Sequence, residues 1–169
     1  MAQGAQTGPR IAQQPILVVD QDQLLTRSAR GQALLRQIEA EQQELASENR
    51  QIESELEAEE QALAARREAM TPEAFLPLAD AFDAKVVRLR AQQQDKLTRL
   101  AAHTEEKRQE FFRDIVPLML ELMNSYGATM LLDSETVLFA APGTNITAEA
   151  IRMLDQNTST TPEEETEND

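Results

Sequence analysis

The sequence predicts an α+β fold in which a long antiparallel α-helical hairpin, a coiled-coil tentacle, projects from a small β-sheet body that oligomerises. Three observations support this prediction. Residues 24–70 contain no proline and carry apolar residues at alternating steps of four and three, which is typical of a coiled-coil helix. Pro72 then marks a tight break, after which a second apolar stripe follows. Short apolar runs flank the helical region at residues 16–19 and 129–140, where we expect strands.

The composition disfavours several classes of function. The chain of 169 residues has 30 acidic and 16 basic side chains, a formal charge of −14, no cysteine and one histidine. Without cysteine there are no disulfides, thiolate metal sites or cysteine nucleophiles, and the acidic balance opposes binding to phosphate backbones. The sequence has no P-loop and no nucleophile–base pair supported by spacing. We therefore expect no enzymatic activity, no catalytic residues, no metal, no cofactor and no nucleic-acid partner.

No transmembrane segment is expected either. The most apolar stretch, residues 115–123, is interrupted by Glu121 and is far shorter than the roughly 20 residues that a membrane span needs.

The N-terminal part is expected to contain a leader, a strand and a long helix. Residues 1–15 show no periodicity and are predicted to be a disordered leader. The run ILVV at residues 16–19 is typical of a strand buried on both faces. Asp20 or Asp22 can cap the helix that follows. We expect that helix to continue unbroken over residues 24–70, for about 70 Å at 1.5 Å per residue.

The second helix is expected to begin at Pro72, because Thr71 is a good N-cap and proline fits the first helical position. Pro117 lies inside this helix and predicts a kink near Arg113. Gly127 is a natural residue to follow the helix end.

Two helices of matching length joined by a tight break are expected to fold back on each other. The hairpin would cover residues 23–126, with its tip near residues 66–76. Four polar residues occupy seam positions that a tight zipper would fill with apolar side chains, and they predict a soft, flexible seam: Gln42, Asn49, Glu59 and Arg66.

The remaining C-terminal sequence predicts a β-hairpin followed by a short helix. Apolar residues 129–132 and 137–140 surround a polar connection, which is a hairpin signal. Thr147 can cap the last helix, and residues 156–169 are expected to be a disordered acidic tail.

Together, residues 16–22 and 127–155 should form a β-rich body with this short C-terminal helix. A sheet of two or three apolar strands with open edges is marginal alone and tends to pair with other chains. We therefore expect oligomerisation through the strand residues Ile16, Leu17, Val18, Val19, Met130, Leu131, Leu132, Val137, Leu138 and Phe139.

The two ends of the chain resemble the Skp/OmpH family of periplasmic chaperones. The resemblance begins with ILVVD at residues 16–20 and continues through SARG at residues 28–31. It is most specific at residues 127–156, GATMLLDSETVLFAAPGTNITAEAIRMLDQ. There the family shows a glycine, an apolar strand ending in Asp, a second apolar strand, a turn, and an Ile-Thr that caps the last helix. The resemblance covers about residues 16–154.

This resemblance implies an ATP-independent holdase that encloses unfolded outer-membrane or periplasmic clients between helical arms and prevents their aggregation. It implies unfolded outer-membrane β-barrel proteins as partners, a homotrimer, and a periplasmic location, with the signal peptide absent from this sequence. The alternative is a structural or scaffold coiled-coil protein without chaperone activity, which would need only the helices.

The charge of this chain departs from the family, whose familiar members are basic. Residues 32–70 carry ten acidic and four basic side chains, whereas residues 71–116 carry eight of each. The acidic first helix predicts a preference for basic or neutral client segments, and it puts a family-type lipopolysaccharide site in doubt.

Cationic and apolar residues near the hairpin tip are the candidate client contacts: Arg66, Arg67, Met70, Phe75, Leu76, Phe82 and Lys85. Flexible methionine and exposed aromatic side chains suit promiscuous binding. The alternative is ordinary interhelical pairing of the cations with Glu68, Asp80 and Asp83, and simple packing of the hairpin tip by the apolar residues.

Overall fold

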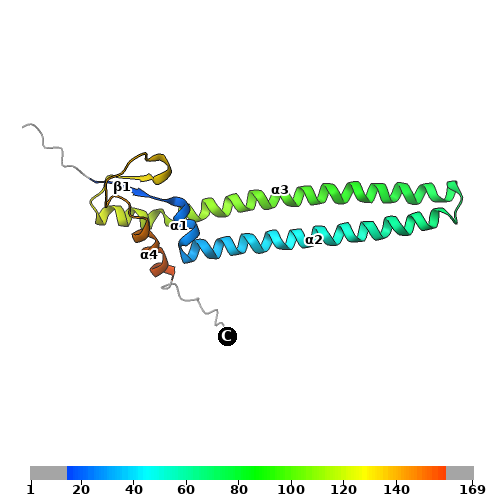
Figure 1. Cartoon of the computed structure of the whole chain (residues 1–169), viewed down its shortest axis with the longest axis horizontal. Coiled ribbons are helices and arrows are strands. Elements are labelled where there is room, and N and C mark those ends of the chain that lie inside the picture. The colour runs from blue at the N-terminus through cyan, green and yellow to red at the C-terminus, as the bar shows by residue number, and fades with distance from the viewer. Residues whose placement is uncertain (1–14, 159–169) are drawn as a thin grey trace, which may run out of the picture. The chain divides into compact units, whose positions relative to one another are not determined.

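The computed structural model describes residues 15–158. Its elements follow in the order β1 (Ile16–Val19), α1 (Gln21–Arg27), α2 (Ala29–Arg67), α3 (Pro72–Ser125), β2 (Met130–Asp133), the 3₁₀ helix η1 (Ser134–Thr136) and α4 (Thr147–Thr158) (Figure 1). The expected α+β class is confirmed, since long helices accompany a small two-stranded sheet. The expected disordered leader lies outside the described residues except for Pro15. The part of the expected acidic tail beyond the end of α4 also lies outside the described residues.

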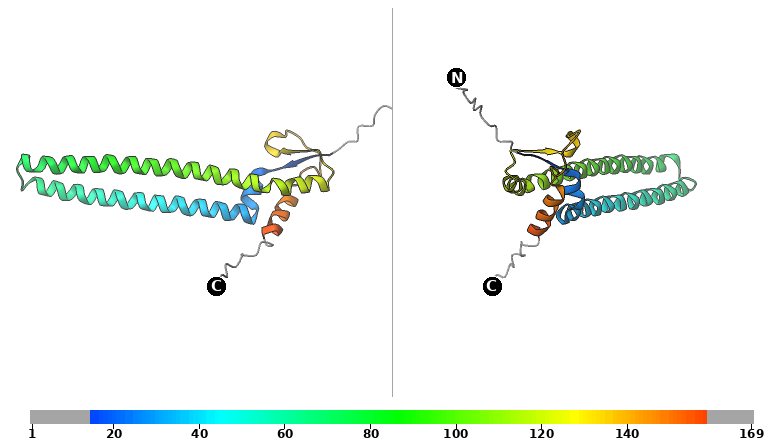
Figure 2. Two further views of the ribbon diagram at one scale, coloured as in Figure 1. Left: turned by 180° about the vertical axis from the view of Figure 1, so that it is seen from behind. Right: turned by 60° about the vertical axis from the view of Figure 1, so that its left-hand side comes forward.

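The chain divides into two compact units, a hairpin unit (Leu34–Glu110) and a body unit, whose described residues are 15–33 and 111–158. In the hairpin unit, α2 and α3 run side by side in opposite directions (Figures 1 and 2). Three cross-helix ion pairs fix their register: Lys85–Glu59, Lys96–Glu48 and His103–Glu41. From one ion pair to the next, the residue number in α3 rises by as many positions as the residue number in α2 falls. This is the register of the expected antiparallel hairpin.

The hairpin tip forms where the sequence predicts it. Helix α2 ends at Arg67 and α3 begins at Pro72. The carbonyl of Thr71 accepts hydrogen bonds from the N–H groups of Ala74 and Phe75, at 3.1 and 3.0 Å. Helix α3 then continues without interruption through Pro117 to Ser125.

The expectation of one unbroken first helix is wrong. The helix starts earlier, at Gln21, and the chain breaks at Ser28, whose backbone is extended at φ −73° and ψ 150°. The buried Ser28 Oγ accepts a hydrogen bond of 3.0 Å from the N–H of Gly31 and so caps α2. A Cβ on Gly31 would lie 2.0 Å from the carbonyl oxygen of Leu25. A periodic pattern of apolar residues does not reveal such a break, because the seam positions continue through it.

The expected antiparallel β-hairpin is also wrong. Strand β2 pairs instead with β1, in parallel, so that Ile16 is opposite Met130. The Asp133 carboxylate accepts the N–H of Glu135 at 2.8 Å and starts η1, and residues 137–140 form no strand. Parallel strands need a long connection, and the connection here is the entire helical segment. Local sequence does not specify a pairing between strands so far apart.

The body sheet has a further neighbour on one side only. Val18 forms a bridge with Asn145, in which Val18 donates to the carbonyl of Thr144 and accepts from the N–H of Ile146, both at 2.9 Å. Strand β1 is therefore central, and among the described residues β2 has a strand neighbour on one edge alone.

The core of the described chain lies mainly in the body unit, where four elements contribute apolar side chains. These are Leu17, Val18 and Val19 of β1; Leu24 and Leu25 of α1; Phe111, Ile115, Leu118, Met119 and Leu122 of α3; and, next to and within α4, Ile146, Ala150 and Leu154. Burial of three consecutive β1 residues confirms that both faces of this strand are covered.

Two hydrogen bonds connect α4 to the N-terminal segment. The N–H of Asp20 donates to Thr147 Oγ1 at 2.9 Å, and the N–H of Ala29 donates to Asp155 Oδ1 at 2.7 Å.

Candidate functional site

The long hairpin helices present apolar side chains to solvent. In the hairpin unit only Ile38 and Leu45 are buried. Leu76 and Val87 are 63% and 69% exposed, and Leu97 is 47% exposed. Two helices can cover only one stripe of each other. The hairpin unit therefore presents apolar surface to solvent at several places along α3.

A hollow between α2 and α3 lies near the tip, with a volume of about 480 Å³. We call it the tip groove, and its lining residues are Glu59, Ala62, Leu63, Arg66, Leu78, Ala81, Phe82, Ala84, Lys85 and Arg88. It exists because three alanines stand where larger side chains would fill the space between the helices. Its charged residues comprise three cations and one carboxylate, in a chain whose net charge is −14.

The candidate client contacts are divided between two places. Arg66, Phe82 and Lys85 line the tip groove. The guanidinium of Arg67 lies over the ring of Phe75, 5.8 Å from its centre. Of the remaining candidates, Met70 is partly buried and Leu76 is largely exposed.

Interhelical pairing is found for one of these cations, but not with the acids named from the sequence. Lys85 pairs with Glu59, across the hairpin, rather than with Asp80 or Asp83. Within the described residues Arg66 makes no ion pair. Arg88 belongs to the cationic cluster that the sequence places near the tip, whereas the alanines of the groove were not predicted. The helical spacing of Ala81, Lys85 and Arg88 was the available signal, but it gains meaning only with the register of α2.

Two polar atoms in the hairpin seam are buried without a hydrogen-bond partner in the described structure: Asn49 Oδ1 and Gln93 Nε2. One is an acceptor and the other a donor, and they come from different helices. Of the four polar seam residues noted in the sequence, Asn49 is thus an unsatisfied interruption of the seam, whereas Glu59 has its Lys85 partner and Arg66 lines the groove.

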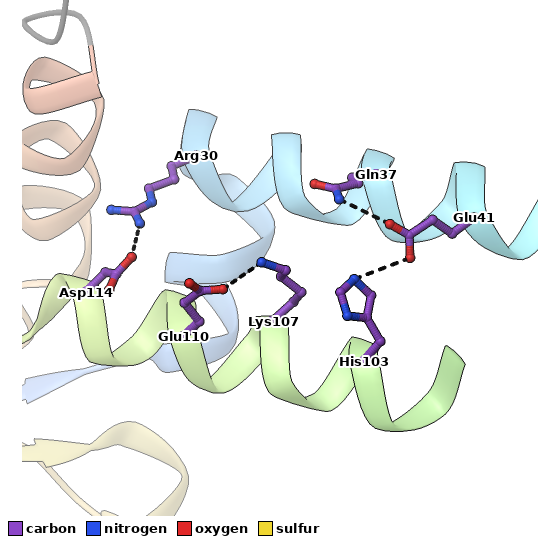
Figure 3. Close-up of polar contacts among 7 residues, drawn as sticks. All are labelled: Arg30, Gln37, Glu41, His103, Lys107, Glu110 and Asp114. Atoms are coloured by element: carbon purple, nitrogen blue, oxygen red, sulfur yellow. Dashed lines mark hydrogen bonds and ion pairs between the residues drawn. The ribbon is translucent and has the colours of Figure 1, made fainter. Parts of the chain in front are cut away.

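Polar contacts near the start of α2 and the middle of α3 are shown in Figure 3. In the hairpin unit Glu41 accepts from Gln37 at 3.1 Å and lies 3.8 Å from His103 Nε2. Lys107 pairs with Glu110 at 2.8 Å, and this carboxylate raises the pKa of Lys107. In the body unit Arg30 pairs with Asp114. These contacts stabilise the helices and form no catalytic arrangement.

The body unit carries a second exposed apolar surface. Leu138 and Phe139 are 87% and 90% exposed. The segment that contains them follows η1 and lies on the opposite side of β1 from α4 (Figure 2). Met130 and Ile16, at one end of the paired strands, are each 48% exposed.

The same unit contains an apolar hollow of about 330 Å³, which we call the body groove. Phe112, Val116, Leu120 and Leu131 are among its lining residues, and Val116 and Leu120 are about half exposed. Of the expected oligomerisation residues, Leu17, Val18 and Val19 are buried in the core of their own chain. The exposed ones, Leu138 and Phe139 above all, remain available to another copy.

Residues 15–158 contain neither a metal-binding cluster nor a membrane-spanning helix. No three acidic or histidine side chains are grouped so as to hold a metal ion. None of the helices in this part of the chain is long and apolar enough to cross a membrane.

Comparisons with known proteins agree with this architecture. The family model described as "Outer membrane protein (OmpH-like)" matches residues 15–154. A crystal structure of an OmpH-like protein from Caulobacter crescentus CB15, whose description proposes an outer membrane chaperone, superimposes with a TM-score of 0.81 at 20% sequence identity. The alignment covers 95% of this chain and 94% of the other, so the two share a fold over nearly their full lengths. The comparison with curated protein sequences gave no match.

Proposed function

This chain belongs to the OmpH-like family, a family of chaperones, and we propose that it is an ATP-independent holdase. It binds unfolded outer-membrane or other periplasmic client proteins between helical arms and keeps them from aggregating. The observation that supports this proposal best is the apolar surface of the hairpin unit. A scaffold coiled coil has no use for leucine and valine side chains exposed along α3.

Holding of this kind works by mass action. A protein that binds the unfolded state and not the native state lowers the concentration of unfolded chain that is free to aggregate. Release without nucleotide hydrolysis requires contacts that are individually weak and numerous. Partly exposed apolar side chains, spread along two helices, supply such contacts.

We propose that the chain acts as a homotrimer assembled through the body unit. The free edge of β2 offers backbone groups for pairing with another chain. Leu138 and Phe139 are large apolar side chains that the described residues of their own chain leave uncovered, and the body groove of a second copy is an apolar surface that could receive them. A contact between two different surfaces repeats from copy to copy and closes into a ring when the rotation allows.

A periplasmic location follows the general location of the family, and the client proposal depends on it. Unfolded β-barrel proteins pass through that compartment before they reach the outer membrane, so a holdase there would meet them.

The proposal is tested by suppression of aggregation. An unfolded β-barrel protein is diluted from denaturant, without ATP, into the parent chain or into a variant with Leu76→Gln, Val87→Gln and Leu97→Gln. We expect the parent to keep the client soluble at stoichiometric concentration, and the variant to require several-fold more protein, because its apolar contacts are gone. Glutamine retains good helix propensity, so the helices should remain.

The matched control carries glutamine at three exposed alanines of the hairpin unit, Ala46→Gln on α2 and Ala91→Gln and Ala101→Gln on α3, and should behave as the parent. If the parent itself leaves the client to aggregate, the scaffold function takes the place of the chaperone function. If variant and parent suppress aggregation equally, the exposed hairpin residues are not the holding surface.

A further inference from the structure

We propose that the tip groove binds short segments of unfolded polypeptide in which a carboxylate stands next to a large apolar side chain. This inference rests on the proposed holdase function and names the chemistry of one of its client sites. At the tip groove the proposed preference is for acidic segments, whereas the acidic first helix predicts a preference for basic or neutral segments.

The shape of the groove suits a side chain rather than a whole helix. Ala62, Ala81 and Ala84 leave the hollow open, and all three are exposed. Leu63, Leu78 and Phe82 also line the groove, and each is only partly buried. A visiting leucine or phenylalanine side chain would cover these residues and gain the free energy of removing apolar surface from water.

The unpaired charges at the groove are cationic. Lys85 and Glu59 satisfy each other. Arg66 of α2 and Arg88 of α3 line the same groove, and neither side chain makes an ion pair or a hydrogen bond with any described residue. A guanidinium presents a planar set of donors that matches a carboxylate in two parallel hydrogen bonds. A polypeptide segment with a carboxylate beside an apolar side chain can therefore pair with the two arginines and cover the apolar residues of the groove.

The net charge of the chain does not prevent this binding. At physiological ionic strength charges are screened over about 8 Å. A short peptide segment in the groove therefore responds mainly to Arg66, Arg88 and their immediate surroundings. An anionic bilayer extends over many such lengths and meets the acidic surface of the whole chain. The local chemistry favours a polypeptide segment, and the net charge disfavours a lipid surface.

The preference is expected to be modest. Ion pairs in exposed positions stabilise a complex only slightly, so two of them should give a roughly three- to tenfold difference in affinity. A weak preference of this size agrees with clients that must leave again without ATP.

The test measures the binding of short dye-labelled peptides to the full chain by fluorescence anisotropy. The peptides share a Leu-Phe centre and differ only in two flanking residues, which are Glu, Gln or Lys. We expect the Glu peptide to bind roughly three- to tenfold more tightly than the Gln peptide, and the Lys peptide to bind most weakly. The Arg66→Gln, Arg88→Gln double variant should lose the preference for Glu over Gln, and rising salt should remove it in the parent.

Two further variants separate charge from shape. Arg50 and Arg99 are also exposed, one on each helix, and make no ion pair among the described residues, so Arg50→Gln with Arg99→Gln should keep the full preference. Ala81→Leu fills the hollow without changing charge, and it should weaken the binding of all three peptides alike. Equal affinity for the Glu and Gln peptides, or no binding of any peptide, would overturn the proposal.

Vesicles containing phosphatidylglycerol test the lipid alternative. Binding of these vesicles that depends on Arg66 and Arg88, together with peptides that show no Glu preference, would assign the groove to an anionic lipid and contradict the proposal. Aggregation suppression distinguishes this failure from a failure of the holdase function. A parent that still protects an unfolded β-barrel protein leaves the function intact even if the groove shows no preference.

Discussion

Single residues at the junction of α1 and α2 decide how the body unit is built. Ser28 is fully buried and caps α2, and Gly31 brings the backbone of α2 against the carbonyl of Leu25. In the sequence these residues look like weak seam positions of a continuous helix. In the structure they are the residues that allow the chain to turn sharply between two helices.

Replacement of Gly31 by alanine tests this reading of the junction. In an ordinary helix interior Gly→Ala stabilises by up to about 1 kcal/mol. Here the new Cβ would meet a backbone oxygen at 2.0 Å, so we expect destabilisation of roughly 1–3 kcal/mol, as for other overpacked sites. Urea unfolding, followed by circular dichroism at fixed protein concentration, gives the difference in the free energy of unfolding between the variant and the parent. Ala33→Gly, at an exposed position of α2, is the reference. It should lower the free energy of unfolding only by the usual difference in helix propensity between alanine and glycine. A stabilised Gly31→Ala variant would contradict the close approach.

At the level of elements, the helical hairpin and the positions of β1 and β2 were predictable, but the break at Ser28 and the pairing of the strands were not. The helical hairpin follows from local information: apolar residues at steps of four and three, and the Thr71-Pro72 break. The pairing of β2 with β1 depends on residues more than a hundred positions apart, which no local pattern specifies. Residues 137–140 look like a strand by composition, yet η1 turns the chain away and they remain irregular.

The candidate sites show the same division between local and long-range information. The cationic and apolar character of the tip was evident from residue types alone. Which cations remain unpaired depends on the register between α2 and α3, since Glu59 neutralises Lys85 and leaves Arg66 and Arg88. The identity of the exposed body residues depends likewise on the fold, because β1 is buried in its own chain.

The N-terminus of α1 makes one element sensitive to acid. The Asp20 carboxylate accepts the backbone N–H of Gln23 at 2.9 Å and its side-chain amide at 2.6 Å. These hydrogen bonds lower the pKa of Asp20 below its ordinary value of 3.8. The stabilisation from the ionised carboxylate is therefore complete above about pH 4 and is lost as the pH falls through the lower pKa of the folded state.

Asp20→Asn checks this, because asparagine still caps a helix but does not titrate. We expect the parent to melt at a higher temperature than the variant at pH 7, and the difference to shrink at pH 3. Asp22→Asn, in the same first turn, is the control, since its carboxylate accepts no hydrogen bond in the described structure. The difference in melting temperature between Asp22→Asn and the parent should change less between pH 7 and pH 3. A difference for Asp20→Asn that is the same at both pH values would contradict the assigned role of the charge.

At the scale of the whole molecule, the two units supply two different surfaces. The hairpin unit exposes apolar side chains that suit weak contacts with unfolded clients, and the body unit exposes Leu138, Phe139 and a strand edge that suit contact with another copy. Holding a client between arms needs both, because one hairpin alone cannot surround an unfolded chain. Assembly and client binding should therefore be lost together.

Sedimentation of the chain with one β-barrel protein, supplied either unfolded or natively folded in detergent, tests whether client binding depends on assembly. In the absence of ATP, the parent by itself should sediment as a trimer. It should form a discrete complex with the unfolded client and should not bind the folded client. Phe139→Asp, at a side chain that is 90% exposed in the single chain, should leave the monomer folded but place a charge in the proposed interface, where burial is costly. It should sediment as a monomer with much weaker client binding. A parent that sediments as a monomer at micromolar concentration, or that binds folded and unfolded client equally, would contradict the account.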